Sequence, residues 1–223
     1  DFDLVVMRLM REELGQGVRL RIDPNGNWSF EAAMRVGREL LPLDLEYLED
    51  PVWGLDSMAR LRKDVPIPFA TNMCVIDFDS LPVGIRMGAA DVILADPHRW
   101  GGLWRSKKLS GVCEAFGLGM GIHSGAEAGL STAANLHLAA STPQIYFAVD
   151  SHYHHLKDDI LAGGMLRFQE GRMHVPEGPG LGVEVDEDKL GLYAERFASQ
   201  GEIEFAGGDV NRPEWLPTRP LWY

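Results

Sequence analysis

The chain has 223 residues, of which 45% are apolar and 24% charged, an ordinary composition for a globular domain with a sizeable core. Its formal net charge of −12 argues against a nucleic-acid partner, and no stretch approaches the roughly 18 apolar residues of a membrane helix. With two cysteines and no signal peptide at its start, the chain is expected in a reducing cytoplasm.

Short apolar runs alternate with segments of helical spacing along the chain, which predicts an α/β fold. Helices are predicted over residues 4–14, 30–41, 55–63, 77–87, 103–116 and 127–141. Strands are predicted over residues 19–23, 45–49, 67–72, 91–97, 118–123 and 146–152. Apolar strands that alternate with helices are typical of a buried parallel sheet.

Each predicted strand ends in a polar residue, and successive ends lie 23 to 29 residues apart. This spacing is near the roughly 31 residues per unit of an eight-unit TIM-type barrel. A barrel collects the ends of all its strands on one face. The competing architecture, a doubly wound open sheet, concentrates its ligand groups near one switch point. Because every predicted strand ends in a polar residue, the barrel is the favoured prediction.

The predicted barrel is incomplete, with six strands, and residues 4–14 are interpreted as the helix of an earlier unit. We therefore expect the chain to begin inside the barrel and a missing N-terminal segment or another polypeptide to complete it. After the sixth strand, 157–185 is turn-rich and β-like, 186–199 is helical, and the tail is an extended aromatic arm. The predicted parts are a partial barrel over 1–160 and a C-terminal portion over 161–223 that completes it.

Three successive strands end in oxygen-bearing side chains, those of Asp23, Glu49 and Asn72. Each has a structural interpretation when taken alone: a turn at Asp23, a strand stop at Glu49 and a cap at Asn72. At matching ends of adjacent parallel strands, however, the three converge on one face. Carboxylate and amide oxygens suit a hard cation such as Mg²⁺ or Mn²⁺, with positions left open for water and substrate.

The next two strands end in Asp96 and His123. A carboxylate beside an imidazole orients the ring and favours its protonated form, which makes a general base that can later act as an acid. The alternative, a core histidine bonded to a backbone carbonyl, is less favoured beside three oxygen ligands. The last strand ends in Asp150 and His152. His152 begins a histidine-rich stretch that could suggest a transition-metal cluster, but a role beside the substrate is favoured.

With these residues in place, the sequence resembles the enolase superfamily and, within it, the glucarate dehydratases. The matching stretches keep the family order over roughly residues 1–190, and the Asn72 ligand and the Leu-Ala-Asp-Pro-His stretch are distinctive of that subgroup. Most superfamily members place a carboxylate where Asn72 stands. The matching stretches are 22–28, 49–51, 70–73, 94–98, 123–124, 149–152 and 179–186.

The resemblance implies a modified (β/α)7β barrel that a separate capping domain precedes in the chain. It implies Mg²⁺, or Mn²⁺, on Asp23, Glu49 and Asn72. It also implies that His123, paired with Asp96, serves as the acid and the base. Homo-oligomers are common in the family and are expected for this chain.

The implied substrate is an acid sugar, with glucarate as the first candidate, and Asn25, Ser124, Asp150 and His152 are expected near it. The implied reaction removes the proton α to a carboxylate and eliminates the β-hydroxyl to give a 2-keto-3-deoxy acid. Removal of this very weakly acidic proton places charge on the carboxylate oxygens. A divalent cation bound there would stabilise the enediolate.

The sequence departs from the family at three points. The lysine pair of the second barrel strand and the capping domain are not in this chain, which alone is therefore expected to be inactive. Gly125 and Ala126 stand where the family has two asparagines, and neither Arg212 nor Arg219 aligns with the substrate-binding arginine of its tail. Two alternatives stay open: a racemase or epimerase that uses the same enediolate with a second base, and a non-catalytic homologue that keeps the metal site.

Overall fold

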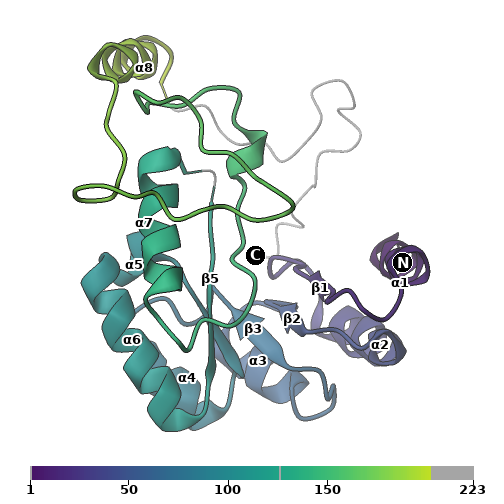
Figure 1. Cartoon of the computed structure of the whole chain (residues 1–223). Coiled ribbons are helices and arrows are strands. Elements are labelled where there is room, and N and C mark those ends of the chain that lie inside the picture. The colour runs from purple at the N-terminus through teal and green to yellow at the C-terminus, as the bar shows by residue number, and fades with distance from the viewer. Residues whose placement is uncertain (1, 126, 202–223) are drawn as a thin grey trace.

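The structure is a computed structural model that describes residues 2–125 and 127–201 (Figure 1). Its centre is a five-stranded sheet of β1 (Arg21–Ile22), β2 (Tyr47–Glu49), β3 (Phe69–Thr71), β4 (Val92–Ala95) and β5 (Gly119–Ile122). Neighbouring strands are parallel and follow one another across the sheet in chain order. An order without a reversal has no switch point, so these strands are not doubly wound and follow the winding of a barrel.

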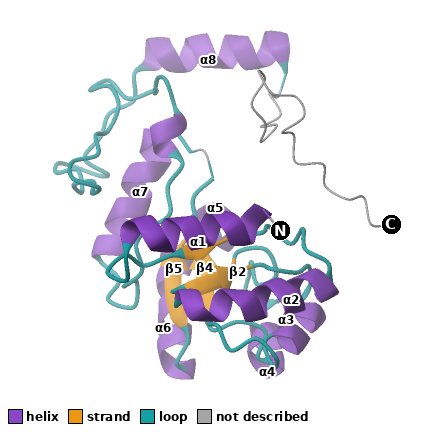
Figure 2. Cartoon of the chain, turned by 90° about the vertical axis from the view of Figure 1, so that its right-hand side faces the viewer, coloured by secondary structure: helices purple, strands orange, loops and turns teal. Residues whose placement is uncertain are grey.

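A helix follows each strand and packs outside the sheet (Figures 1 and 2). The helices are α1 (Phe2–Leu14), α2 (Phe30–Leu40), α3 (Leu55–Leu61), α4 (Leu81–Met87), α5 (Pro97–Trp100), α6 (Leu103–Phe116), α7 (Gly129–Ala140) and α8 (Glu187–Gln200), with 3-10 turns η1 (Leu41–Leu43) and η2 (Tyr153–His155). The sequence pattern explains α2: Ser29 caps it by accepting from the Ala32 N–H, and Ala33, Val36 and Leu40 are buried at helical spacing. The predicted helices are confirmed to within a few residues. The sequence did not predict α5, whose four residues are too few to show a helical period.

Two apolar clusters hold the helices against the sheet. The first is centred on the fully buried Leu40, Leu48 and Phe69 and joins α1, α2 and α3 to the first strands. The second is centred on Trp100 and Leu109 and joins α5 and α6 to β4 and β5. Burial of one such side chain contributes roughly 1.5–3 kcal/mol, so the strands are firmly held below the polar residues at their ends.

The predicted sixth strand over 146–152 is wrong. This segment meets β5 through one parallel bridge at Ile145 and one hydrogen bond from the Asp150 N–H, at 3.2 Å. Between these two points the Ala148 carbonyl accepts a hydrogen bond of 2.9 Å from the Arg21 side chain instead of one from β5. The ladder is therefore interrupted, although the segment still runs beside β5.

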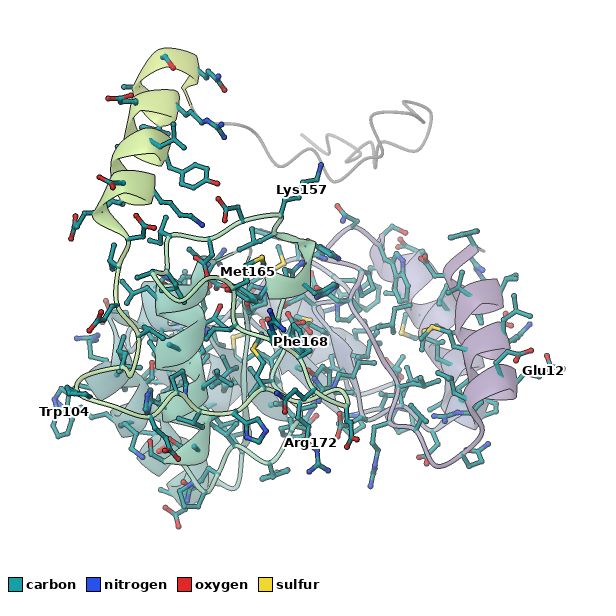
Figure 3. All side chains as sticks on the ribbon, turned by 45° about the horizontal axis from the view of Figure 1, so that its top comes forward. Glu12, Trp104, Lys157, Met165, Phe168 and Arg172 are labelled. Atoms are coloured by element: carbon teal, nitrogen blue, oxygen red, sulfur yellow. The ribbon has the colours of Figure 1, made fainter. Side chains whose placement is uncertain are left out.

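The stretch over 157–185, predicted to be β-like, contains two isolated bridges, one between Leu161 and Val185 and one between Gln169 and Arg172. It crosses α7 before it reaches α8 (Figures 1 and 3). Helix α8 buries none of its residues and lies apart from the sheet (Figure 2). The aromatic tail predicted beyond residue 201 lies outside the described residues. None of the described helices combines the length and the apolar character needed to cross a bilayer.

Candidate functional site

A cavity of about 600 Å³ opens at the carboxyl ends of the strands. The predicted site residues that line it are Asp23, Asn25, Glu49, His123, Ser124, Asp150 and His152. The other two predicted residues, Asn72 and Asp96, directly follow β3 and β4, which lie between β2 and β5 in the sheet. The structure therefore places the candidate residues along one edge of the sheet, where a barrel carries its functional groups.

Two of the three candidate metal ligands have oxygen atoms without a hydrogen-bond partner. Glu49 and Asn72 are 8% and 5% exposed, and Glu49 Oε1 and Asn72 Oδ1 are buried acceptors that no donor of the described residues reaches. An unsatisfied buried acceptor costs free energy comparable to a lost hydrogen bond, so native structures rarely keep one. Such a pair of oxygens fits a site built for a bound cation.

The electrostatics of the same residues agree with this interpretation. Burial, followed by the nearby carboxylates, raises the pKa of Glu49 well above its ordinary value. Burial also raises the pKa of Asp23, although the Asn25 N–H donates to Asp23 Oδ1 at 2.7 Å and partly opposes the shift. A divalent cation would remove the repulsion between these carboxylates. The donor set of two carboxylates and one amide oxygen suits Mg²⁺ or Mn²⁺.

Asp50 is a site residue whose importance the sequence did not indicate beyond a strand stop. It is fully buried, and its carboxylate accepts from Thr71 Oγ1 at 2.6 Å and from the backbone N–H groups of Asn72 and Met73 at 2.9 and 3.2 Å. Burial raises the pKa of Asp50 while these three donors oppose the shift. Asp50 thereby fixes the backbone that carries Asn72 beside the end of β2.

Asp96 and His123 lie side by side at the ends of β4 and β5. His123 Nδ1 is 3.4 Å from Asp96 Oδ2, an ion-pair distance longer than a normal N–H···O hydrogen bond, and Nδ1 has no hydrogen-bond partner among the described residues. Burial opposes the ionisation of Asp96, but its interactions with His123 and with the ring and backbone N–H of His98 outweigh burial and lower its pKa to about 2. Asp96 is therefore a carboxylate that can orient and stabilise a protonated His123.

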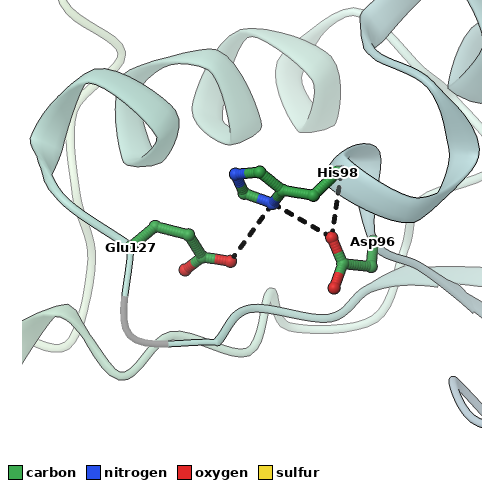
Figure 4. Close-up of side chains that lie close together, drawn as sticks. All are labelled: Asp96, His98 and Glu127. Atoms are coloured by element: carbon green, nitrogen blue, oxygen red, sulfur yellow. Dashed lines mark hydrogen bonds and ion pairs between the residues drawn. The ribbon is translucent and has the colours of Figure 1, made fainter. Parts of the chain in front are cut away.

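A second histidine, His98, shares the same carboxylate (Figure 4). Asp96 Oδ1 accepts from the His98 N–H at 3.0 Å and contacts His98 Nδ1 at 3.1 Å, while His98 Nε2 is 3.2 Å from Ser131 Oγ. Glu127 Oε1 lies 3.8 Å from His98 Nδ1. Sequence reasoning gave no role to His98 or Glu127, because their meeting depends on how the loop after β5 folds back.

Asp96, His98 and Glu127 form the second donor group that could hold a metal, with ligand atoms all within 4.8 Å of one another. The atoms that face one another in this group already have hydrogen-bond partners in the chain. Glu49 Oε1 and Asn72 Oδ1, by contrast, have no hydrogen-bond partner within residues 2–125 and 127–201. The strand-end group is therefore the better candidate for the metal.

Asp150 and His152, the last predicted residues, line the same cavity. Asp150 Oδ2 and His152 Nε2 are 3.7 Å apart, and both side chains are about two-fifths exposed, which leaves them accessible to a bound molecule. Asn25 has a positive φ of 53°, which an asparagine in a turn tolerates, and it lines the cavity beside Asp23. Ala126, Arg212 and Arg219 lie outside the described residues.

The comparisons with known proteins agree with the fold. Residues 1–189 match the family described as enolase C-terminal domain-like, and the chain belongs to the enolase superfamily. It is 40% identical over 212 residues to a Streptomyces coelicolor protein named "Probable glucarate dehydratase", covering 92% of this chain and 49% of that protein.

Solved structures are similar over the same region. An isomerase from Streptomyces coelicolor A3(2) has a TM-score of 0.85 at 47% identity, covering 90% of this chain and 53% of that one. An enolase from Thermobispora bispora, complexed with magnesium and formate, has a TM-score of 0.85 at 43% identity, covering 90% and 47%. The chain spans about half the length of the relatives it matches.

Proposed function

We propose that this chain supplies the metal ligands and the acid-base residues of a Mg²⁺-dependent acid-sugar dehydratase. The observation that carries the proposal is the pair of buried oxygens on Glu49 and Asn72 that have no partner among the described residues, at the same edge of the sheet as the Asp96–His123 pair. The relative named as a glucarate dehydratase makes glucarate the first acid sugar to test. The related structure with magnesium and formate supports a divalent cation and a carboxylate ligand for this class of site.

The proposed chemistry follows from how the residues face the cavity. Asp23, Glu49 and Asn72 would hold the cation, which when bound supplies positive charge to the substrate carboxylate and stabilises the enediolate. His123 Nδ1 faces Asp96, so Nε2 is the nitrogen available to the substrate. His123 Nε2 removes the α-proton and then returns it to the departing β-hydroxyl, which leaves as water. Loss of water gives the enol of a 2-keto-3-deoxy acid.

A second candidate is a racemase or epimerase that uses the same enediolate. The similar structure described as an isomerase favours this candidate. It needs a second base on the opposite side of the α-carbon, and the resemblance places such a lysine upstream of the first strand of this chain. The cation ligands and His123 would keep the same roles.

In the test, the full-length protein is incubated in D₂O with Mg²⁺ and with each member of a panel of hexarates, hexonates and pentonates. Mass spectrometry reads loss of water and uptake of deuterium together. We expect loss of water from one acid sugar. Deuterium uptake without loss of water would favour the epimerase, and no reaction with any acid while Mg²⁺ is bound would leave a non-catalytic homologue.

The variant His123→Asn tests the role of the base. We expect it to lower the rate of α-deuterium exchange by about 10³-fold or more, because it removes the nitrogen that takes the proton. Mg²⁺ binding, measured by calorimetry, should stay unchanged because His123 is not among the proposed ligands. Exchange at the wild-type rate would contradict the proposed mechanism.

A further inference from the structure

The loop between β5 and α7 folds so that Glu127 turns back onto the two residues that follow His123. The Glu127 side chain is only 9% exposed. Its Oε1 accepts from the Gly125 N–H at 2.8 Å, and its Oε2 accepts from the Ser124 hydroxyl. A nearly buried carboxylate thus lies directly behind the part of the loop that lines the cavity.

This arrangement fixes what Ser124 can offer to a bound molecule. A serine hydroxyl has one hydrogen to donate and two lone pairs to accept with. Among the described residues, both acceptors of Ser124 Oγ belong to its own loop: the Glu127 carboxylate and the Gly125 carbonyl at 2.9 Å. The hydrogen therefore stays inside the loop, and the oxygen keeps lone pairs with which it can accept from a bound molecule. A substrate group opposite Ser124 has to be a donor, such as a hydroxyl.

The charged residues that line the cavity support the same conclusion. Asp150 places a second carboxylate on the cavity beside Ser124. The one arginine that lines the cavity among the described residues is Arg21, and it is held by Glu46 at 2.6 Å and by the Ala148 carbonyl at 2.9 Å. A carboxylate of the substrate placed opposite Ser124 would meet negative charge and an acceptor.

We propose that Glu127 determines substrate specificity by making Ser124 an acceptor, so that the site prefers a polyhydroxy acid with one carboxylate over the corresponding dicarboxylate. The position of the first carboxylate, at Asp23, Glu49 and Asn72, rests on the proposed function. The preference itself is a property of binding and needs no turnover. It predicts an aldonate as a better ligand than an aldarate, so glucarate, the first candidate suggested by the relative, is not the acid expected to bind best.

Among the described residues, Arg172 is the arginine that could instead favour a dicarboxylate. It lines the adjoining cavity of about 280 Å³ together with Ser124 and Asp150, and its side chain is exposed (Figure 3). If Arg172 were the recognition group for a second carboxylate, the dicarboxylate would bind better, and Arg172→Gln would abolish that advantage. The two interpretations therefore predict opposite orders of affinity.

The test compares D-gluconate with D-glucarate, which differ only in that the sixth carbon is a hydroxymethyl group or a carboxylate. Each is titrated by calorimetry into the full-length protein in excess Mg²⁺. We expect gluconate to bind about tenfold more tightly, the effect of one well-placed hydrogen bond. Glu127→Gln removes the charge and gives the loop a donor in its place, so we expect it to reduce this ratio about tenfold. Glu114→Gln, the same change at an exposed position on α6, should leave the ratio unchanged.

Tighter binding of glucarate by the wild type, or binding of neither acid, would overturn the proposal. An unchanged ratio in a folded Glu127→Gln protein would overturn it as well. If that variant does not fold, Ser124→Ala takes its place and should weaken gluconate binding while leaving glucarate binding the same. Gluconate that binds well while no acid of the panel loses water would refute the dehydratase and leave the specificity proposal standing.

Discussion

At the residue scale, two adjacent acids at the end of β2 have opposite surroundings. Asp50 is fully buried, and its oxygens accept from Thr71, Asn72 and Met73. Glu49 is also buried but has an oxygen without any partner among the described residues. One acid therefore organises the chain, and the other is left free for a ligand from outside it. The sequence shows only two acids before a proline.

Asp50→Asn tests the organising role. An amide NH₂ group would face donors that a carboxylate now satisfies, so we expect the free energy of unfolding to fall by about 1–3 kcal/mol. Urea denaturation measures the change. Asp44→Asn is the matched control, because Asp44 has a positive φ of 47°, as Asp50 has one of 33°, but Asp44 is exposed. We expect the stability of the Asp44→Asn protein to stay within about 0.5 kcal/mol of the wild type. Equal stability of the two variants would contradict the role given to Asp50.

At the element scale, α7 is held at its first residue by a segment that follows the cavity wall. The Gly129 N–H donates to both oxygens of the buried Asp159, at 3.0 and 3.1 Å, and the Tyr153 hydroxyl donates to the same carboxylate. This contact joins the loop after His123 to the segment after His152. A side chain at position 129 would not fit, because a Cβ there would lie 2.2 Å from Asp159 Oδ2.

Gly129→Ala is therefore expected to destabilise the fold by about 1–3 kcal/mol through overpacking. Gly111→Ala, inside α6, is the opposite case, because a Cβ there meets no atom within 4 Å. We expect it to stabilise the protein by up to about 1 kcal/mol, since alanine favours a helix over glycine. Thermal or urea unfolding measures the change in stability of each variant, expected to be negative for Gly129→Ala and positive for Gly111→Ala. A Gly129→Ala protein more stable than the wild type would contradict the close packing at this position.

The elements also show what could be predicted from the sequence. The ends of the five strands were predictable because an apolar run followed by a polar residue depends only on neighbours in the chain. The extended segment around Phe147 fits the same pattern, but the Arg21 side chain competes for its Ala148 carbonyl, and a sequence pattern carries no sign of that. The meeting of Glu127 with His98 is hidden from the sequence for the same kind of reason, because the two residues lie 29 positions apart with α6 and β5 between them.

At the scale of the whole molecule, the carboxylates at the strand ends make stability depend on pH when no metal is bound. The pKa of Asp23 is raised from 3.8 to about 7, chiefly by burial, and that of Glu49 is raised as well. A group whose pKa is higher in the folded state contributes stability that is present below its unfolded pKa and is lost as the pH rises through the folded value. Without Mg²⁺, the molecule should therefore lose stability as the pH rises from about 4 to about 7 through Asp23, and on to about 9 through Glu49.

We expect the urea concentration at the unfolding midpoint, measured in a chelator, to decrease as the pH is raised from 5 to 8. Asp96, whose pKa is lowered to about 2, makes stability rise with pH, but only below this window. Asp23→Asn should flatten this dependence. Saturating Mg²⁺ should reverse it, because the cation binds the ionised carboxylates. A midpoint that rises with pH in the chelator would contradict the account of a repulsive, metal-free cluster.

The most direct measurement is the position of Mn²⁺ in crystals of the full-length protein, located by its anomalous scattering. We expect a single strong peak about 2 Å from the side-chain oxygens of Asp23, Glu49 and Asn72. A peak among Asp96, His98 and Glu127 instead, or no peak near the carboxyl ends of β1, β2 and β3 at saturating Mn²⁺, would contradict it.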